Sequence, residues 1–158
     1  MAMSSSVRRV LAAIAERVDE DRLVMLESTG KSSQEAADQL GVGVAQIAKS
    51  IVFTQGEEQR SGVVVVISGA LRVDADKVAE VVGPVTAARA DAVKAVTGFS
   101  IGGVSPIGLP PSARILVDRS LLEFDRIWPA AGHPHAVFSL TPDELVSWTG
   151  AEVGSFAE

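Results

Sequence analysis

The sequence predicts an α+β fold built on a mixed β-sheet. Helix signals alternate with short apolar runs, but without the regular rhythm of repeated βαβ units. The clearest strand is the β-branched run at 62–68, which we expect to be buried on both faces. The chain has no internal repeat or interdomain linker, and 158 residues is a natural size for one domain. We therefore predict a single domain over residues 1–158.

The first half of the chain is expected to hold two helices and three strands. Ser6 can cap a helix whose apolar residues recur at helical spacing as far as Val18. Ser32 and Glu35 offer a capping box for a second helix, which ends at Gly41. Strands are expected at 23–26, 50–55 and 62–68, the second of them after a turn that contains Lys49.

The second half is expected to hold three helices and four strands. Helices are predicted at 74–82, 91–97 and 142–150, and strands near 85–88, 114–118, 126–130 and 135–140. Asp74 caps the first of these helices, and Gly83 followed by Pro84 ends it. Thr141 and Glu144 form a capping box for the last helix.

The composition excludes several classes of function. A net charge of −6 argues against a protein that wraps long stretches of nucleic-acid backbone. The absence of cysteine excludes disulfides, thiolate metal sites and a cysteine nucleophile. No apolar stretch reaches the length of a membrane-spanning helix, and the first residues lack the order of a secretory signal. We therefore expect a cytoplasmic protein without a membrane partner.

The most informative segment is the loop at 102–110, which is rich in glycine and proline. Glycine lets a ligand approach the backbone and proline restricts the loop, so the segment indicates a preformed cradle of amides for an oxygen-bearing group. Lys49 is its expected companion, because a lone cation stands there among mostly apolar residues. Both features have plainer interpretations: an ordinary surface loop, and a lysine whose stem covers apolar neighbours while its ammonium reaches water.

Short motifs occur in an order that resembles the YbaK and prolyl-tRNA synthetase insertion-domain family, whose members are aminoacyl-tRNA deacylases. The motifs lie at 47–53, 69–74, 97–106, 115–118, 131–138 and 143–150. The resemblance implies a partly barrel-like mixed sheet with surrounding helices. It also implies a freestanding hydrolase that needs no metal or organic cofactor and that removes a small noncognate amino acid, with tRNA for proline as the expected carrier.

The partner implied by this resemblance is mischarged tRNA, held only at its acceptor end. Local cations for such a grip are Lys31, Lys49, Arg60 and Arg72. An aminoacyl-tRNA synthetase is a second partner that the family allows. The alternative to catalysis is a noncatalytic module that uses the same pocket to bind an aminoacyl group or a partner protein.

The resemblance also assigns the site residues. It places Lys49 at the terminal phosphate or the aminoacyl carbonyl, where an ammonium stabilises negative charge as the ester is attacked. The loop contributes backbone amides at Gly102, Gly103 and Ser105, which polarise the carbonyl or orient a water. The remaining substrate-binding residues are expected to be Ser50, Val104, Pro106, Asp118, Gly132 and His133. A bulky imidazole at His133 is expected to limit the amino acid admitted.

Other assignments are open to these residues. Residues 43–50 nearly spell a phosphate-binding loop, but the expected turn and strand are in the wrong order for one. Ser105 lacks Asp and His partners, so we expect no covalent acyl-enzyme. His133 and His135 share one face but lack a third ligand, which disfavours a metal site. Asp118 is equally well explained as the cap of a following helix.

Overall fold

The computed structural model describes residues 4–14, 22–27, 32–58 and 60–158. Its strands are β1 (Leu23–Met25), β2 (Ile47–Gln55), β3 (Ser61–Ser68), β4 (Thr86–Ala87), β5 (Arg114–Asp118), β6 (Trp128–His133), β7 (Ala136–Phe138) and β8 (Glu152–Gly154). Its α-helices are α1 (Ser5–Ile14), α2 (Ser33–Leu40), α3 (Ala75–Val82), α4 (Ala90–Thr97) and α5 (Pro142–Thr149). Two 3-10 helices are η2 (Val44–Gln46) and η3 (Arg119–Glu123).

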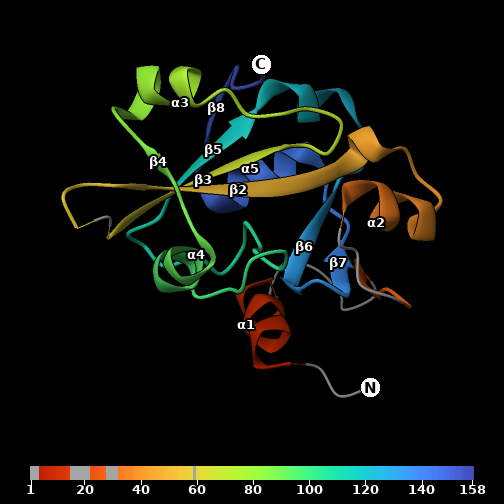
Figure 1. Ribbon diagram of the computed structural model, residues 1–158. Helices are drawn as coiled ribbons and strands as arrows, with labels where there is room; N and C mark the ends of the chain where they lie inside the picture. Colours follow the sequence, from red (N-terminus) through yellow and green to blue (C-terminus); the bar gives the residue numbers. More distant parts are fainter. Residues whose placement is uncertain (1–3, 15–21, 28–31, 59) are drawn as a thin grey trace.

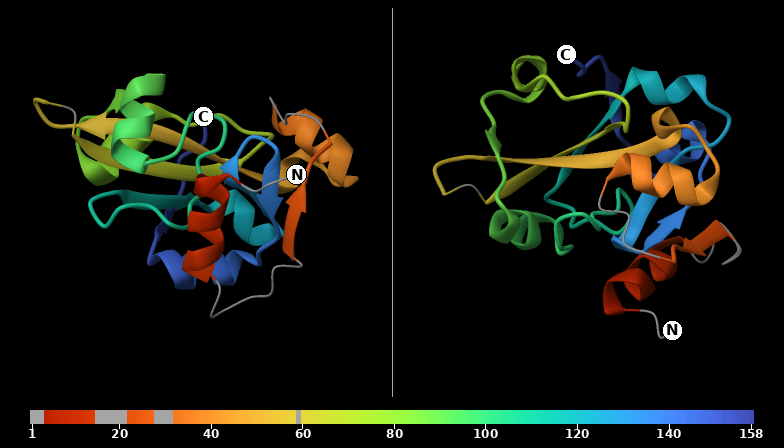
Figure 2. Two further views of the ribbon diagram at one scale, coloured as in Figure 1. Left: turned by 90° about the horizontal axis from the view of Figure 1, so that it is seen from below. Right: turned by 45° about the vertical axis from the view of Figure 1, so that its right-hand side comes forward.

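Within these residues, eight strands form one mixed sheet in the order β1-β7-β6-β2-β3-β5-β8, with β4 paired to β2 (Figures 1 and 2). The pairs β1/β7, β6/β7, β2/β3 and β2/β4 are antiparallel, whereas β2/β6, β3/β5 and β5/β8 are parallel. This confirms the α+β fold with a mixed sheet that the sequence predicts. None of the described helices is both long and apolar enough to cross a membrane.

Helix ends follow the capping signals of the sequence. The predicted caps are present at Ser32, Gly41, Asp74, Gly83, Thr141 and Glu144. The first helix differs, because α1 begins at Ser5 and the hydroxyl of Ser4 accepts a hydrogen bond from Val7 N at 3.2 Å. Ser4, rather than the predicted Ser6, therefore caps this helix. Its expected continuation to Val18 lies outside the described residues.

The strand β2 is longer than the sequence predicts, and this difference places the lysine. The expected turn around Lys49 is wrong, since the strand already begins at Ile47. Tertiary pairing extends it: Ile47 and Ala48 pair with the start of β6, and Ala48 also pairs with the end of β3. Lys49 therefore stands inside a strand that is fixed on at least one edge. The short strand β8 was not expected either, because its order comes from pairing with β5 and not from its own pattern.

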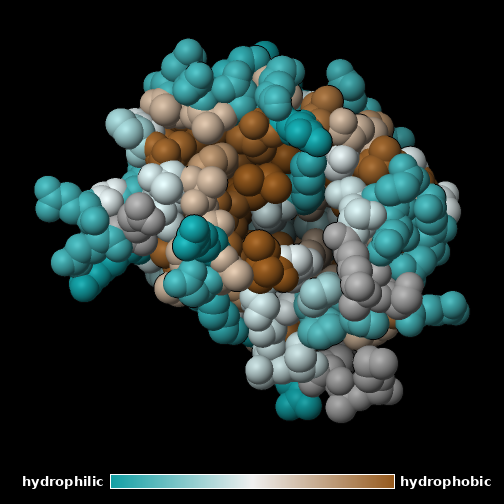
Figure 3. Space-filling model, viewed as in Figure 1, coloured by the Kyte–Doolittle hydropathy of each residue, from teal (hydrophilic) through white to brown (hydrophobic). Residues whose placement is uncertain are grey.

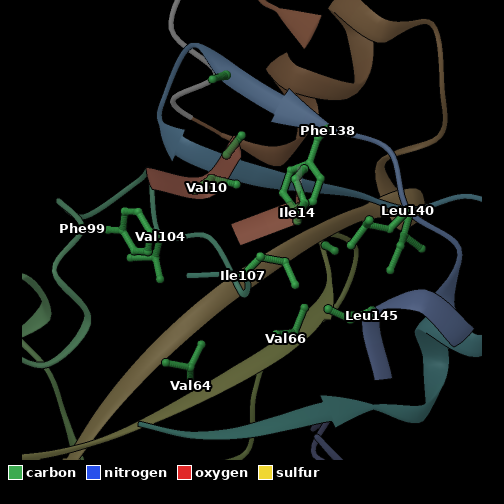
Figure 4. Close-up of a cluster of buried hydrophobic side chains, with 14 of the residues drawn as sticks. Val10, Ile14, Val64, Val66, Phe99, Val104, Ile107, Phe138, Leu140 and Leu145 are labelled. Atoms are coloured by element: carbon green, nitrogen blue, oxygen red, sulfur yellow. The ribbon is translucent and has the colours of Figure 1, made fainter. Parts of the chain in front are cut away.

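The core lies on both faces of β3, as predicted for this β-branched run. Val64 and Val66 face a cluster that includes residues of α1, α4 and the loop after α4 (Figure 4). Val63 and Val65 face a second cluster with α3. All four valines are 0% exposed. The sheet thus holds α1 and α4 on one side and α3 on the other, and the loop at 99–111 passes along the first side.

Candidate functional site

A cavity of about 320 Å³ lies where β2, α2, the loop after α4 and the β6–β7 hairpin meet. Viewed as in Figure 1, the surface is hollowed near its centre and hydrophobic beside the hollow (Figure 3). The lining consists of Leu26, Ser32, Ser33, Ala36, Ile47, Ala48, Lys49, Ser50, Ile51, Ile101, Gly102, Val104, Ala130, Pro134 and Val137. A volume of this size is at the small end of ligand-binding cavities.

Part of one edge of β2 is unpaired, and the residues of this part line the cavity. On the edge opposite β3, the parallel pairing with β6 covers positions 47–48 and the pairing with β4 covers 53–54. Between these pairings, no described strand covers positions 49–51. Adjacent strand residues point to opposite faces, yet Lys49, Ser50 and Ile51 all line the cavity. The cavity therefore wraps around this free stretch of strand edge.

Lys49 is an uncompensated cation in this wall. Burial lowers the pKa of its ammonium below the usual 10.5, and the nearby charge of Arg72 lowers the pKa further. Across the described residues the ammonium has no hydrogen-bond or ion-pair partner. Its charge, together with that of Arg72, favours an anion or a carbonyl oxygen at this end of the cavity.

Ser50 supplies a second unengaged polar group. Its Oγ is buried and has no hydrogen-bond partner, although the residue lines the cavity. Leaving a buried hydroxyl unpaired costs about 1–3 kcal/mol. A ligand group that hydrogen-bonds to Ser50 Oγ removes this cost when it binds, which makes Ser50 a contact that favours an occupied cavity.

The loop after α4 contributes Gly102 and Val104 to the lining, in a stretch with several unpaired backbone amides. Gly102 and Val104 line the cavity, and Gly102 has a φ of 87°, in the region that favours glycine. The amide of Gly103 donates to Ser100 O at 3.0 Å within a turn. In the described structure, the amides of Gly102, Val104 and Ser105 donate to no other protein group. Amides that secondary structure leaves unpaired are available to a carbonyl oxygen.

The tip of the β6–β7 hairpin contacts this loop, and Pro134 of the tip lines the cavity. A Cβ at Gly103 would lie 2.9 Å from both Cα and N of His133, so the two backbones touch at this point. The Nδ1 atom of His133 accepts a hydrogen bond from His135 N at 3.1 Å, and the two imidazole rings are 5.2 Å apart. With Nδ1 as acceptor, the proton of the neutral ring is assigned to Nε2.

The structure separates the predicted site residues into groups. Lys49, Ser50, Gly102 and Val104 line the cavity, while Gly103 and His133 contact each other and are not among the lining residues. Ser105 and Pro106 are buried, and Ser105 Oγ accepts from Ile107 N at 3.0 Å within the turn. Lys31, one of the expected cations, lies outside the described residues, and Arg60 lies on the exposed β2–β3 hairpin, paired with Glu58 at 2.7 Å.

Two further predicted residues serve neighbouring elements. The carboxylate of Asp118 accepts hydrogen bonds from Ser120 N and Ser120 Oγ, which makes Asp118 the cap of η3, and it also accepts from Phe156 N at 2.7 Å. This confirms the alternative of a helix cap. Gly132 packs on α1, because a Cβ there would lie 2.6 Å from Ser6 O. Neither residue is part of the cavity lining.

Sequence reasoning missed the apolar and helical parts of the lining. Ser32, Ser33 and Ala36 come from the start of α2, where Ser32 was recognised only as a helix cap. Ala130 and Val137 belong to paired strands and read as ordinary core residues. No cluster of three or more His, Asp or Glu among the described residues could hold a metal ion.

The geometry can be compared with known proteins. The model of the aminoacyl-tRNA editing domain matches residues 27–147. The chain belongs to this family. The family includes deacylases, so the match confirms the resemblance drawn from the sequence and the expectation of an enzyme that deacylates aminoacyl-tRNA. The cavity and the loop at 99–111 lie almost entirely within the matched range, whereas α1 lies outside it.

Several known proteins resemble the chain over most of its length. The "Uncharacterized protein YwhH" of Bacillus subtilis is 30% identical over 135 residues, or 85% of each chain. The "Putative Cys-tRNA(Pro)/Cys-tRNA(Cys) deacylase EbsC" of Enterococcus faecalis is 30% identical over 129 residues, covering 80% of this chain and 76% of EbsC. A solved structure described as "a putative trans-editing enzyme for prolyl tRNA synthetase" superimposes with a TM-score of 0.88 at 37% identity over 99% of both chains.

The chemistry available in this editing domain is narrow. Lys49 is the one ionisable side chain among the described lining residues, and none of them is an acid, a histidine or a cysteine. The serines of the lining have no Asp-His pair beside them, which a serine nucleophile requires. The site can therefore polarise a carbonyl with an ammonium and free amides, but it offers no side-chain nucleophile with an ordinary activating base.

Proposed function

We propose that this protein hydrolyses the ester of tRNA for proline that carries a small noncognate amino acid, in trans to the synthetase. The observation that carries the proposal is the composition of the cavity: one ammonium, free backbone amides and apolar walls, with no acid or imidazole among the described lining residues. An aminoacyl ester is activated already, so a placed water and stabilisation of the developing negative charge are sufficient for its hydrolysis.

In this mechanism the substrate carbonyl lies between Lys49 and the loop after α4. The amides of Gly102 and Val104 hydrogen-bond the carbonyl oxygen, and the Lys49 ammonium stabilises the charge that develops on it. The buried hydroxyl of Ser50 binds the α-amino group or the ribose of the terminal adenosine. The free hydroxyl of that adenosine orients the attacking water and relays its proton to the leaving oxygen. No covalent intermediate with the protein forms.

The relatives and the cavity support a small side chain on tRNA for proline. EbsC is named for Cys-tRNA(Pro), and the superimposed structure is named for prolyl-tRNA synthetase. The walls that receive the side chain are Ile47, Ala130 and Val137, which are apolar and belong to paired strands. Such walls reject bulk by contact but discriminate poorly between side chains that differ by one methylene. We therefore expect a substrate range that centres on alanine and its near neighbours.

Turnover tests the proposal directly. The purified protein is incubated with tRNA for proline charged with alanine, serine, cysteine, threonine, 2-aminobutyrate or proline, and ester loss is followed against the uncatalysed rate. We expect rapid loss of a small noncognate amino acid and retention of proline. If no charged tRNA for proline loses its amino acid above background, the proposal is wrong.

The role of the ammonium is tested with a matched pair of variants. Lys49→Ala is expected to lower the single-turnover rate about 100-fold to 1,000-fold, the usual cost of removing a group that stabilises the developing oxyanion. Lys77→Ala is the control, because Lys77 Nζ bonds Ala157 O at 2.6 Å, outside the cavity lining. A folded Lys49→Ala protein with wild-type rate removes Lys49 from the mechanism.

A further inference from the structure

Helix α1 lies outside the matched range of the editing domain, yet it packs against the walls of the site. Val7, Val10 and Ile14 are at most 2% exposed and belong to the core cluster that contains Phe99, Val104 and Ile107 (Figure 4). At the start of the helix, the carbonyl of Ser6 sits where a side chain at position 132 would be, directly before His133 of β6. Helix α1 therefore contacts both β6 and the loop at 99–111, called the amide loop below because it carries the amides of Gly102 and Val104.

Arg9 ties the two ends of the amide loop to this helix. Its Nε donates to Gly108 O at 2.9 Å and its Nη2 donates to Thr97 O at 3.0 Å, with a further short bond from Nη2 to Gly108 O. The guanidinium carbon lies 4.5 Å above the centre of the Phe99 ring. One planar side chain thus holds the residues that begin and end the segment carrying Gly102 and Val104. A single ammonium lacks the fork that reaches both carbonyls.

The absence of a side chain at Gly98 leaves space for the guanidinium of Arg9. Gly98 has a φ of 78°, and a Cβ at this position would overlap Arg9 Nη1. No carboxylate in the described structure pairs with Arg9. Its positive charge is compensated instead by the carbonyls of Thr97 and Gly108 and by the face of the Phe99 ring. The interaction therefore fixes backbone position, and it is unlike a surface ion pair, which contributes little to geometry.

We propose that α1 is a working part of the editing site and that Arg9 is its positioning residue. Arg9 fixes the loop at 98–108 against β6, and so sets the distance between the amides of Gly102 and Val104 and the Lys49 wall. This inference rests on the proposed function for its kinetic consequence. A shift of about one ångström in reacting groups costs about 100-fold in rate, so a loosened loop lowers kcat while the apolar walls that bind the substrate persist.

Kinetics of variants in the full-length chain test this role. Arg9→Ala is expected to lower kcat about 10-fold to 100-fold with little change in KM, and Arg9→Lys is expected to resemble it because lysine lacks the fork. Millimolar guanidinium should restore part of the kcat of Arg9→Ala, whereas urea at the same concentration should not. Arg8→Ala is the control on the exposed side of the same helix. Wild-type kcat in a folded Arg9→Ala protein, or a loss that guanidinium leaves unchanged, overturns the proposal.

A second variant breaks the interaction without changing Arg9. Gly98→Ala places a methyl group where Arg9 Nη1 lies. Gly150→Ala is the matched control, because Gly150 ends α5 with a similar φ of 67° and has open space where a Cβ would lie. Gly98→Ala should reproduce the kcat loss of Arg9→Ala, and Gly150→Ala should not. Equal kcat in the two glycine variants counts against the role.

Hydrogen exchange separates this inference from the proposed function. Amides of residues 99–108 should exchange faster in Arg9→Ala than in the wild type, whatever the substrate is. If the wild type deacylates nothing, the proposed function fails, but faster exchange still supports the positioning role. Unchanged exchange across this loop overturns it.

Discussion

A single methyl group at position 103 is expected to push the loop after α4 away from β6. Gly103 packs on the backbone of His133 so closely that an added Cβ would lie 2.9 Å from its Cα and N. Carbon atoms in contact prefer about 3.5–4.0 Å, so the loop and β6 must separate by roughly half an ångström to one ångström. Both partners are backbone, and neither can swing aside as the end of a long side chain would.

The Gly103→Ala substitution should therefore affect rate more than stability. Overpacking of this kind costs about 1–3 kcal/mol. In a chain of this length, each kcal/mol lowers Tm by about 2–4 °C. The rate of ester hydrolysis should fall by up to about 100-fold, because the amides of Gly102 and Val104 move with the loop. Thermal unfolding and single-turnover deacylation of the same preparation measure the two effects.

Gly154→Ala provides the matched control for this substitution. A Cβ there would lie 2.8 Å from the ring of Phe156, and Gly154 is in β8, outside the cavity lining. We expect a comparable loss of Tm and an unchanged rate per folded molecule. If Gly103→Ala hydrolyses its substrate as fast as the wild type, the spacing between the loop and β6 does not govern the site, and the reasoning above is refuted.

Three further outcomes are expected. Burial and the charge of Arg72 lower the pKa of Lys49, so the unfolded chain binds this proton more tightly than the folded chain does. The free energy of unfolding should therefore rise with pH between the lowered pKa and 10.5. Measured by urea unfolding, Lys49→Met should lack this rise and be at least as stable as the wild type at neutral pH. Burial raises the pKa of Glu144, but the hydrogen bonds from Arg22 and Thr141 and the charge of Arg22 together outweigh this and lower the pKa below 4.5. Glu144→Gln should thus cost about 1 kcal/mol at neutral pH, a difference that acid titration abolishes as the pH falls through the lowered pKa. His133→Ala tests the steric role expected from the sequence: because His133 is not among the residues that line the cavity, the variant should accept larger side chains no better than the wild type, measured with charged tRNAs of increasing side-chain size.

The elements with local signals could be predicted from the sequence, and those made by tertiary pairing could not. Capping residues such as Ser32 and Asp74 act within one turn of helix, so their effect is visible in a short window. The extension of β2 back to Ile47 depends on β6, because Ile47 pairs with Trp128, far along the chain. The three residues of β8 are ordered by β5 in the same way.

The residues of the candidate site likewise fall into those that a local signal reveals and those that only the folded chain reveals. Lys49 and the loop at 102–106 stand out because a lone cation among apolar residues and a run of glycine and proline are local peculiarities. Ala36, Ala130 and Val137 do not stand out, since they are ordinary apolar residues that become cavity walls only when three separate elements meet. The contact of α1 with Gly132 and the reach of Arg9 across to Gly108 likewise need the folded chain.

Main-chain amides in the loop at 102–105 give this fold an unusual freedom to change. A hydrogen-bond donor that belongs to the backbone is present whatever side chain the residue carries, so mutation at Val104 alters the shape of the wall and leaves its polar group in place. The apolar walls at Ile47, Ala130 and Val137 can drift in size by single substitutions in the same manner. Selectivity for the amino acid can therefore evolve stepwise while hydrolysis persists at each step.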